Sequence, residues 1–131
     1  MTTDSKFSWK KRGKAFIYAW QGIKTLVKEE HNARIHAVAA AVAVSLGFIL
    51  GISGMEWCVL LICIGLVISA EVLNSAVEAL ADRITEDYDP LIGKAKDFGA
   101  AAVTLLAVVS LAVGCIIFLP YIYRLVCGLP G

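Results

Sequence analysis

The sequence predicts an all-α membrane protein in which an N-terminal amphipathic surface helix precedes three transmembrane helices. Three observations carry this prediction. Of the 131 residues, 59% are hydrophobic, and the mean hydropathy of +0.76 is too high for an ordinary soluble domain. The apolar residues also gather into three runs, each near the roughly 20 residues that a helix needs to cross hydrocarbon. A chain this short holds one small membrane domain, which we place over 1–131.

The N-terminal part of the chain, up to Arg34, is polar and basic. We expect residues 1–8 to be disordered and residues 9–30 to form the surface helix, whose apolar side chains recur at helical spacing and lie in the headgroup plane. These side chains are Phe16, Trp20, Ile23 and Val27. The segment lacks a short charged start followed by an apolar stretch, so we expect no cleavable signal and a first membrane segment that stays in the mature protein.

The three apolar runs define the expected membrane helices. They cover residues 35–52, 57–84 and 98–119. Eight of the twelve Lys and Arg residues lie at or before Arg34, the turn at 51–56 has none, and the segment 82–97 carries three more. Because positive charge stays on the cytoplasmic side of a membrane, we expect a cytoplasmic N-terminus and an external C-terminus. Pro90 is expected to break the segment 82–97 into a loop.

Two features have simpler interpretations than a metal site or a nucleic-acid interface. The cysteines show no metal-ligand spacing, so we interpret them as small membrane hydrophobes. They are Cys58, Cys63, Cys115 and Cys127. The basic residues between Lys10 and Lys14 adjoin a membrane span, where anionic lipid headgroups attract them as well as nucleic acid would. We therefore take them to orient the chain and expect no nucleic-acid partner.

A polar stripe at the end of the second apolar run is the most informative feature of the chain. On a helix that turns about 100° per residue, Asn74, Glu78 and Asp82 fall roughly 60°, 20° and 20° from Glu71. Carboxylates at membrane depth are expensive and mark sites for ions, protons or substrates. Glu71 lies roughly 21 Å from the outer boundary of a ~30 Å hydrocarbon core. The stripe therefore leads from lipid toward the cytosol.

Two further polar segments, at 29–36 and 94–97, face the same compartment. The combined carboxylates, amide and cations suit phosphoryl transfer, because Mg²⁺ needs hard oxygen ligands, phosphates need cations and an attacking hydroxyl needs a base. Its depth makes Glu71 the candidate base. The chain has neither a Walker-type phosphate loop nor the signature motifs of protein kinases. The residues alone leave three classes open: a lipid-directed enzyme, an ion- or proton-coupled membrane protein, and a structural polar interface.

The run from Glu71 to Arg83, followed by the segment 95–103, closely resembles the bacterial membrane diacylglycerol kinase and undecaprenol kinase family. The resemblance extends with little or no gapping from about Ala15 to Ile122. Members of this family are homotrimers with composite active sites between protomers. The resemblance therefore implies a homotrimeric lipid kinase of the inner (cytoplasmic) membrane, which transfers the γ-phosphate of ATP to the hydroxyl of a membrane lipid alcohol with Mg²⁺ as cofactor.

The resemblance also implies roles for individual residues. Glu71 and Asn74 are the catalytic pair, with Glu71 as base toward the lipid hydroxyl, while Glu30 and Glu78 bind the Mg²⁺ that ATP carries. Arg34 and Asp82 join the supporting polar shell around the substrate. The implied ATP-binding residues are Lys11, Tyr18, Glu30, Glu78, Asp87, Tyr88, Asp89, Lys96 and Asp97.

Several of these polar and aromatic residues have structural alternatives. Asp97 could cap the third membrane helix, because Asp is a favoured N-cap and suits the helix dipole. Arg34 and His36 could anchor the first span at the interface. Trp20 and Trp57 are interpreted as interfacial anchors.

The lipid is the least determined part of the prediction. The segment 30–36 looks more like the undecaprenol kinase branch than the proteobacterial diacylglycerol branch, which has a carboxylate where His36 stands. We therefore expect undecaprenol as the acceptor, with diacylglycerol as the alternative, and both lipids would use the same site.

Overall fold

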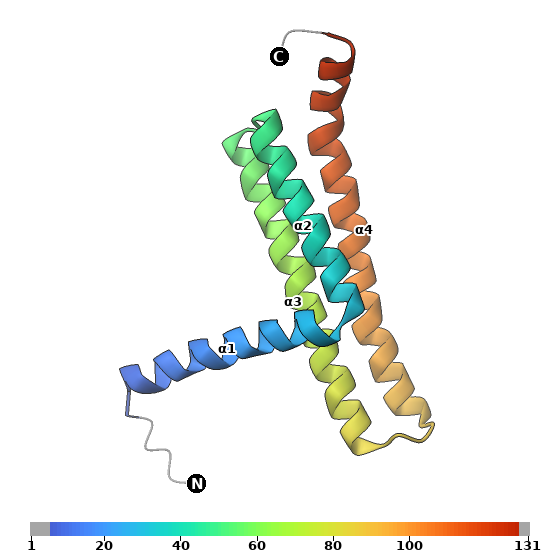
Figure 1. Ribbon diagram of the computed structural model, residues 1–131. Helices are drawn as coiled ribbons and strands as arrows, with labels where there is room; N and C mark the ends of the chain where they lie inside the picture. Colours follow the sequence, from blue (N-terminus) through green and yellow to red (C-terminus); the bar gives the residue numbers. More distant parts are fainter. Residues whose placement is uncertain (1–5, 129–131) are drawn as a thin grey trace.

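A computed structural model of the chain describes residues 6–128 and shows a bundle of three long helices with a fourth helix projecting from one end (Figure 1). The helices are α1 (Trp9–Glu29), α2 (His31–Leu50), α3 (Gly54–Ile84) and α4 (Pro90–Val126). The described residues form no strand, so the all-α prediction is confirmed. The expected disorder of residues 1–8 falls largely on residues 1–5, which lie outside the described range.

Helices α2, α3 and α4 are each long and apolar enough to cross a membrane. This confirms the prediction of three membrane helices. Their outward side chains are mostly exposed apolar groups, as expected of a surface that meets lipid. Helix α1 projects away from the bundle (Figure 1). Most of its apolar side chains are exposed. We call the end of the bundle where α1 joins α2 the α1 end, and the opposite end, at residues 51–53, the turn end.

Arg34 holds the corner between α1 and α2. The single extended residue Glu30 separates the two helices. The guanidinium of Arg34 donates one hydrogen bond to the carbonyl of Val27, over 2.8 Å, and another to the carbonyl of Lys28. These carbonyls belong to the last turn of α1, where helix geometry leaves them without partners. Arg34 therefore fixes the direction of α1 and the place of Glu30.

The expected break in the segment 82–97 is present as the connection 85–89, but Pro90 is the first residue of α4 and does not lie in that connection. The carboxylate of Asp89 accepts hydrogen bonds from the backbone N–H groups of Leu91 and Ile92 and caps the helix. Proline suits this first position because its missing N–H would have no partner there and its φ is already helical. Because α4 starts so early, Asp97 lies inside the helix, and the alternative of Asp97 as its cap is wrong.

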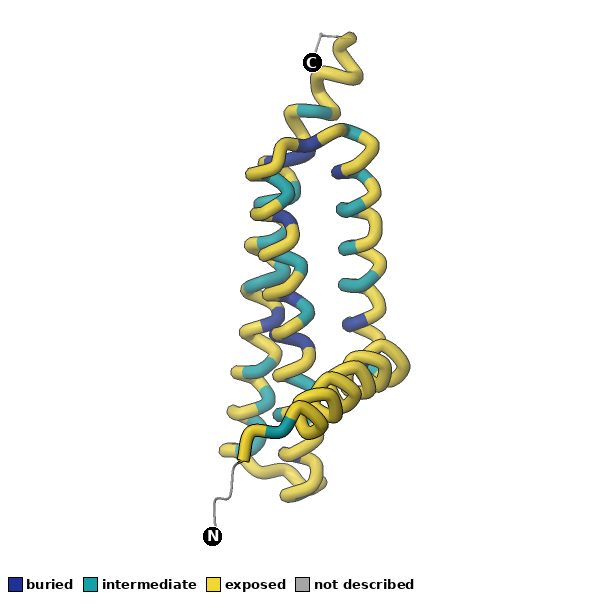
Figure 2. Tube along the Cα trace, turned by 90° about the vertical axis from the view of Figure 1, so that its left-hand side faces the viewer, coloured by how far each residue is buried: buried dark blue, intermediate teal, exposed yellow. Residues whose placement is uncertain are grey.

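Helices α3 and α4 make the most extensive contact, and α2 packs against both with its buried and intermediate residues on the side that faces them (Figure 2). The apolar core lies near the turn end, where Ile52, Leu60, Ile117 and Phe118 form one buried cluster. Trp57 contributes to this end by packing on Gly47, where a Cβ atom would lie 2.7 Å from its ring. The α1 end lacks such a cluster among the described residues, and there polar side chains enter the bundle.

Candidate active site

Glu71 is the one buried charged residue in the described part of the chain, with 4% of its surface exposed. It lies on α3, and the other members of the stripe follow it along that helix. Asn74 and Glu78 are half-buried and Asp82 is exposed. The stripe therefore runs from the interior of the bundle to its surface at the α1 end.

His36 of α2 faces Glu71 across the bundle. Its Nε2 atom lies 3.2 Å from Oε1 of Glu71, and the side chains are 23% and 5% exposed, respectively. The two atoms are close but misaligned for a hydrogen bond, and within the described residues Oε1 of Glu71 has no other partner. From the sequence, His36 was interpreted as an interfacial anchor or a substrate contact, and its approach to Glu71 was not predicted.

Gly99 of α4 makes room for Asn74. A Cβ atom on Gly99 would lie 2.3 Å from Oδ1 of Asn74, closer than any side chain can tolerate. Oδ1 is itself buried and has no hydrogen-bond partner among the described residues. Buried polar atoms nearly always have a hydrogen-bond partner. The two unpaired oxygens on neighbouring turns of α3 are therefore a candidate site at which a ligand or substrate would supply the missing hydrogen bonds. Gly99 had not been singled out from the sequence.

Glu30 and Glu78 both lie toward the α1 end of the bundle. Their helical settings differ, because Glu30 occupies the corner before α2 and Glu78 lies on α3. The described residues contain no cluster of three or more His, Cys, Asp or Glu side chains that could enclose a metal ion. A pair of carboxylates does fit Mg²⁺ that arrives with a nucleotide, since this ion keeps waters and phosphate oxygens as its remaining ligands.

Lys96 is joined to the stripe by an ion pair. Its Nζ atom lies 2.6 Å from Oδ1 of Asp82, which links α4 to α3 at the α1 end. The pair is solvent-exposed, with the two side chains 39% and 62% exposed, so it contributes little stability. Both groups remain accessible to a ligand from solution.

The remaining candidate residues surround this centre without touching it. Lys11 and Tyr18 are exposed on α1, and no hydrogen bond or ion pair of a described residue joins their side chains to α3. The segment 87–89 is an exposed connection between α3 and α4, in which Asp89 serves as the helix cap. Asp97 lies at one end of a shallow depression formed by α4 alone.

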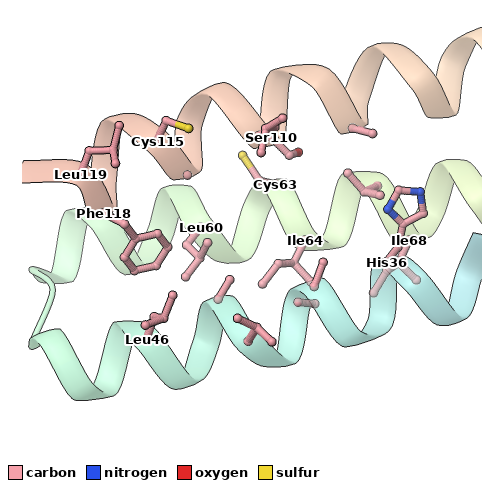
Figure 3. Close-up of a pocket in the computed structure, with 18 residues that line it drawn as sticks. His36, Leu46, Leu60, Cys63, Ile64, Ile68, Ser110, Cys115, Phe118 and Leu119 are labelled. Carbon is pink, nitrogen blue, oxygen red and sulfur yellow. The ribbon is translucent and has the colours of Figure 1, made fainter. Parts of the chain in front are cut away.

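An apolar groove runs between the three long helices, with His36, the neighbour of Glu71, at one end. Its volume is about 540 Å³, and it extends from His36 to Phe118 and Leu119 near the turn end (Figure 3). Small side chains of α2 line much of one wall. A hydrocarbon chain in this groove would have its end beside the one buried carboxylate.

Comparisons with known proteins find a matching family and several relatives. The family described as prokaryotic diacylglycerol kinase matches residues 17–118. The undecaprenol kinase of Bacillus subtilis (strain 168) is 40% identical over 107 residues, which cover 82% of this chain and 87% of that protein. The diacylglycerol kinase of Escherichia coli (strain K12) is 36% identical over 104 residues, covering 79% and 85%. The diacylglycerol kinase of Haemophilus influenzae is 37% identical over 102 residues, covering 77% and 86%.

Proposed function

Because the chain belongs to the prokaryotic diacylglycerol kinase family and is a multi-pass membrane lipid kinase, we propose that it transfers the γ-phosphate of MgATP to the hydroxyl of undecaprenol. One observation carries the proposal. The apolar groove ends at His36, whose Nε2 atom lies 3.2 Å from the buried carboxylate of Glu71, the first member of the polar stripe. A lipid alcohol in the bilayer and a nucleotide in solution can both reach this point.

In the proposed reaction, the hydroxyl oxygen of the lipid attacks the γ-phosphorus and forms the new P–O bond. The bond between the γ-phosphorus and the bridging oxygen of ADP breaks, and the hydroxyl proton moves to the carboxylate of Glu71. Asn74, one turn along α3, holds the reacting groups through its unpaired Oδ1 or its amide N–H. Such catalysis depends on positioning and charge neutralisation.

Glu30 and Glu78 are proposed to bind the Mg²⁺ that comes with ATP. Carboxylate oxygens are the ligands that this ion prefers, and the ion supplies positive charge beside the phosphates when it is bound. Arg34 contributes indirectly, because its hydrogen bonds to the end of α1 hold the corner at which Glu30 lies.

The nucleotide is proposed to lie along the solvent-exposed rim of the α1 end. Lys96, held by Asp82, would contact the phosphates, with Asp97 beside it. The remaining contacts would come from α1 and from the connection between α3 and α4: Lys11, Tyr18, Asp87, Tyr88 and Asp89. Since these groups do not meet around Glu71 in one chain, we propose a homotrimer whose protomers complete one another's sites.

The proposed orientation places the N-terminus and the α1 end in the cytosol, with the protein in the inner (cytoplasmic) membrane. The support is the concentration of basic residues at or before Arg34. This orientation brings the polar stripe to the compartment that contains ATP.

Undecaprenol is favoured over diacylglycerol by similarity of sequence. The segment 30–36 resembles the undecaprenol kinase branch, and the relative from Bacillus subtilis with that name is 40% identical.

Phosphate transfer from radiolabelled MgATP to each lipid tests the proposal. The protein is purified in mild detergent and assayed with undecaprenol and with diacylglycerol side by side. We expect product with both lipids and a higher kcat/KM for undecaprenol. A higher kcat/KM for diacylglycerol would reverse the choice of lipid, and transfer to neither lipid would refute the proposed activity.

A further inference from the structure

We infer that His36 is a positioning residue of this site: an N–H group at its Nε2 holds one oxygen of the Glu71 carboxylate, which leaves the second oxygen for the lipid hydroxyl. The inference rests on the proposed function and adds a residue to it. It starts from the 3.2 Å approach of Nε2 to Oε1, a contact between α2 and α3.

Glu71 requires a donor at this place. A buried carboxylate oxygen without a hydrogen bond is costly, and Oε1 has no aligned partner within residues 6–128. An ionised carboxylate accepts hydrogen bonds and cannot donate them, so the donor must come from another residue. His36, whose Nε2 atom lies 3.2 Å from Oε1, is placed to supply it.

The tautomer follows from the same contact. A nitrogen lone pair facing an anionic oxygen would be repelled, whereas an N–H group is attracted, so Nε2 carries the proton. Catalytic hydrogen bonds are often poorly aligned before the substrate binds and tighten in the complex. A rotation of the imidazole would align the N–H group with Oε1, because the distance between Nε2 and Oε1 is already that of a hydrogen bond.

His36 also lines the groove in which the lipid tail is proposed to lie. Among the described residues that line it, His36 is the one with a basic nitrogen, and its imidazole projects from α2 at the end of the groove nearest the α1 end (Figure 3). A lipid alcohol with its tail in the groove brings its hydroxyl to this end. The hydroxyl proton then moves to the free oxygen of Glu71, while His36 keeps its own proton throughout.

The test compares four variants by kcat and by KM for lipid and MgATP. His36→Phe keeps a ring and removes the donor, His36→Asn places its N–H too close to the backbone to reach Glu71, and His36→Gln returns an N–H near the position of Nε2. We expect kcat to fall about 10- to 100-fold for the first two and to stay within about threefold of wild type for His36→Gln, with both KM values within about threefold. Ile35→Phe, at the exposed neighbouring position, is the matched control and should resemble wild type.

A double variant separates positioning from general damage. If His36 acts through Glu71, adding His36→Phe to Glu71→Gln lowers kcat no further than Glu71→Gln alone. Wild-type kcat in both His36→Phe and His36→Asn would overturn the inference, as would a His36→Gln enzyme as slow as they are. A wild-type protein that phosphorylates neither lipid would instead refute the proposed function on which the inference rests.

Discussion

Two of the carboxylates on helix α3, Glu56 and Glu71, have different surroundings. Glu56, in the first turn, accepts a hydrogen bond from the backbone N–H of Ser53 over 3.0 Å and another from the hydroxyl of Tyr121 over 2.5 Å. Its own backbone N–H donates to the hydroxyl of Ser53, which completes a capping box. Glu71, farther along the same helix, is more deeply buried and has no aligned donor among the described residues.

The difference distinguishes a carboxylate with structural hydrogen bonds from the one proposed to act in catalysis. At the turn end every polar contact of Glu56 starts a helix or joins α3 to α4, and the neighbouring core is apolar. At the α1 end one side-chain oxygen of Glu71 and one of Asn74 stay unpaired among the described residues. An unpaired buried oxygen costs stability, which makes these two residues candidates for binding or catalysis.

The largest expected effect comes from exchanging the two carboxylates for amides. Glu71→Gln should lower kcat about 10³-fold, because general bases contribute roughly 10² to 10⁴. Glu56→Gln is the matched control, and its kcat should stay within about twofold of wild type. Steady-state lipid phosphorylation measures both. Equal activity losses in the two variants would contradict the proposed division between the ends of α3.

The second effect concerns Mg²⁺. Glu78→Gln and Glu30→Gln should each raise the Mg²⁺ concentration needed for half-maximal rate about 10- to 100-fold, because each removes a proposed carboxylate ligand. The exposed Glu86, in the connection between α3 and α4, provides the control variant Glu86→Gln. Titration of the rate with Mg²⁺ at fixed ATP measures the shift. An unchanged midpoint in both variants would exclude these residues as ligands.

A smaller effect is expected from Gly99→Ala. The added methyl group would overlap Oδ1 of Asn74, so this side chain must move away from the site, and we expect kcat to fall about tenfold. Gly93→Ala, on the same helix with no atom near its added Cβ, should leave kcat unchanged. A Gly99→Ala enzyme with wild-type kcat would show that the position of Asn74 is unimportant.

The smallest effect is expected at the turn end. Tyr121→Phe removes the hydroxyl that donates to Glu56 and should lower the melting temperature by a few degrees with no change in kcat. Tyr123→Phe, at an exposed position on α4, should change neither quantity. Thermal unfolding in detergent, followed by circular dichroism, provides the measurement. A loss of activity in Tyr121→Phe without loss of stability would give the turn end a functional role.

Local patterns in the sequence were sufficient to predict the fold class and the polar stripe on α3. Hydropathy is a property of each run of residues, so three spans could be counted without knowing how they pack. The helical period is also local, so Glu71, Asn74 and Glu78 could be placed on one face before any neighbour was known. The start of α4 was missed because the sequence offers two plausible helix beginnings, one at Asp89 followed by Pro90 and one at Asp97. Only the structure shows that Asp89 caps the helix.

The sequence by itself thus determined the number of helices, their apolar character and the placing of carboxylates on one stripe of α3. Only the tertiary structure brought His36 to Glu71, set Gly99 against Asn74 and paired Lys96 with Asp82. The physical reason is that helix periodicity depends on the backbone of one segment, whereas these contacts depend on which faces of separate helices pack together. That choice is made by side chains far apart in the chain, and it separates the satisfied carboxylate of Glu56 from the unsatisfied one of Glu71.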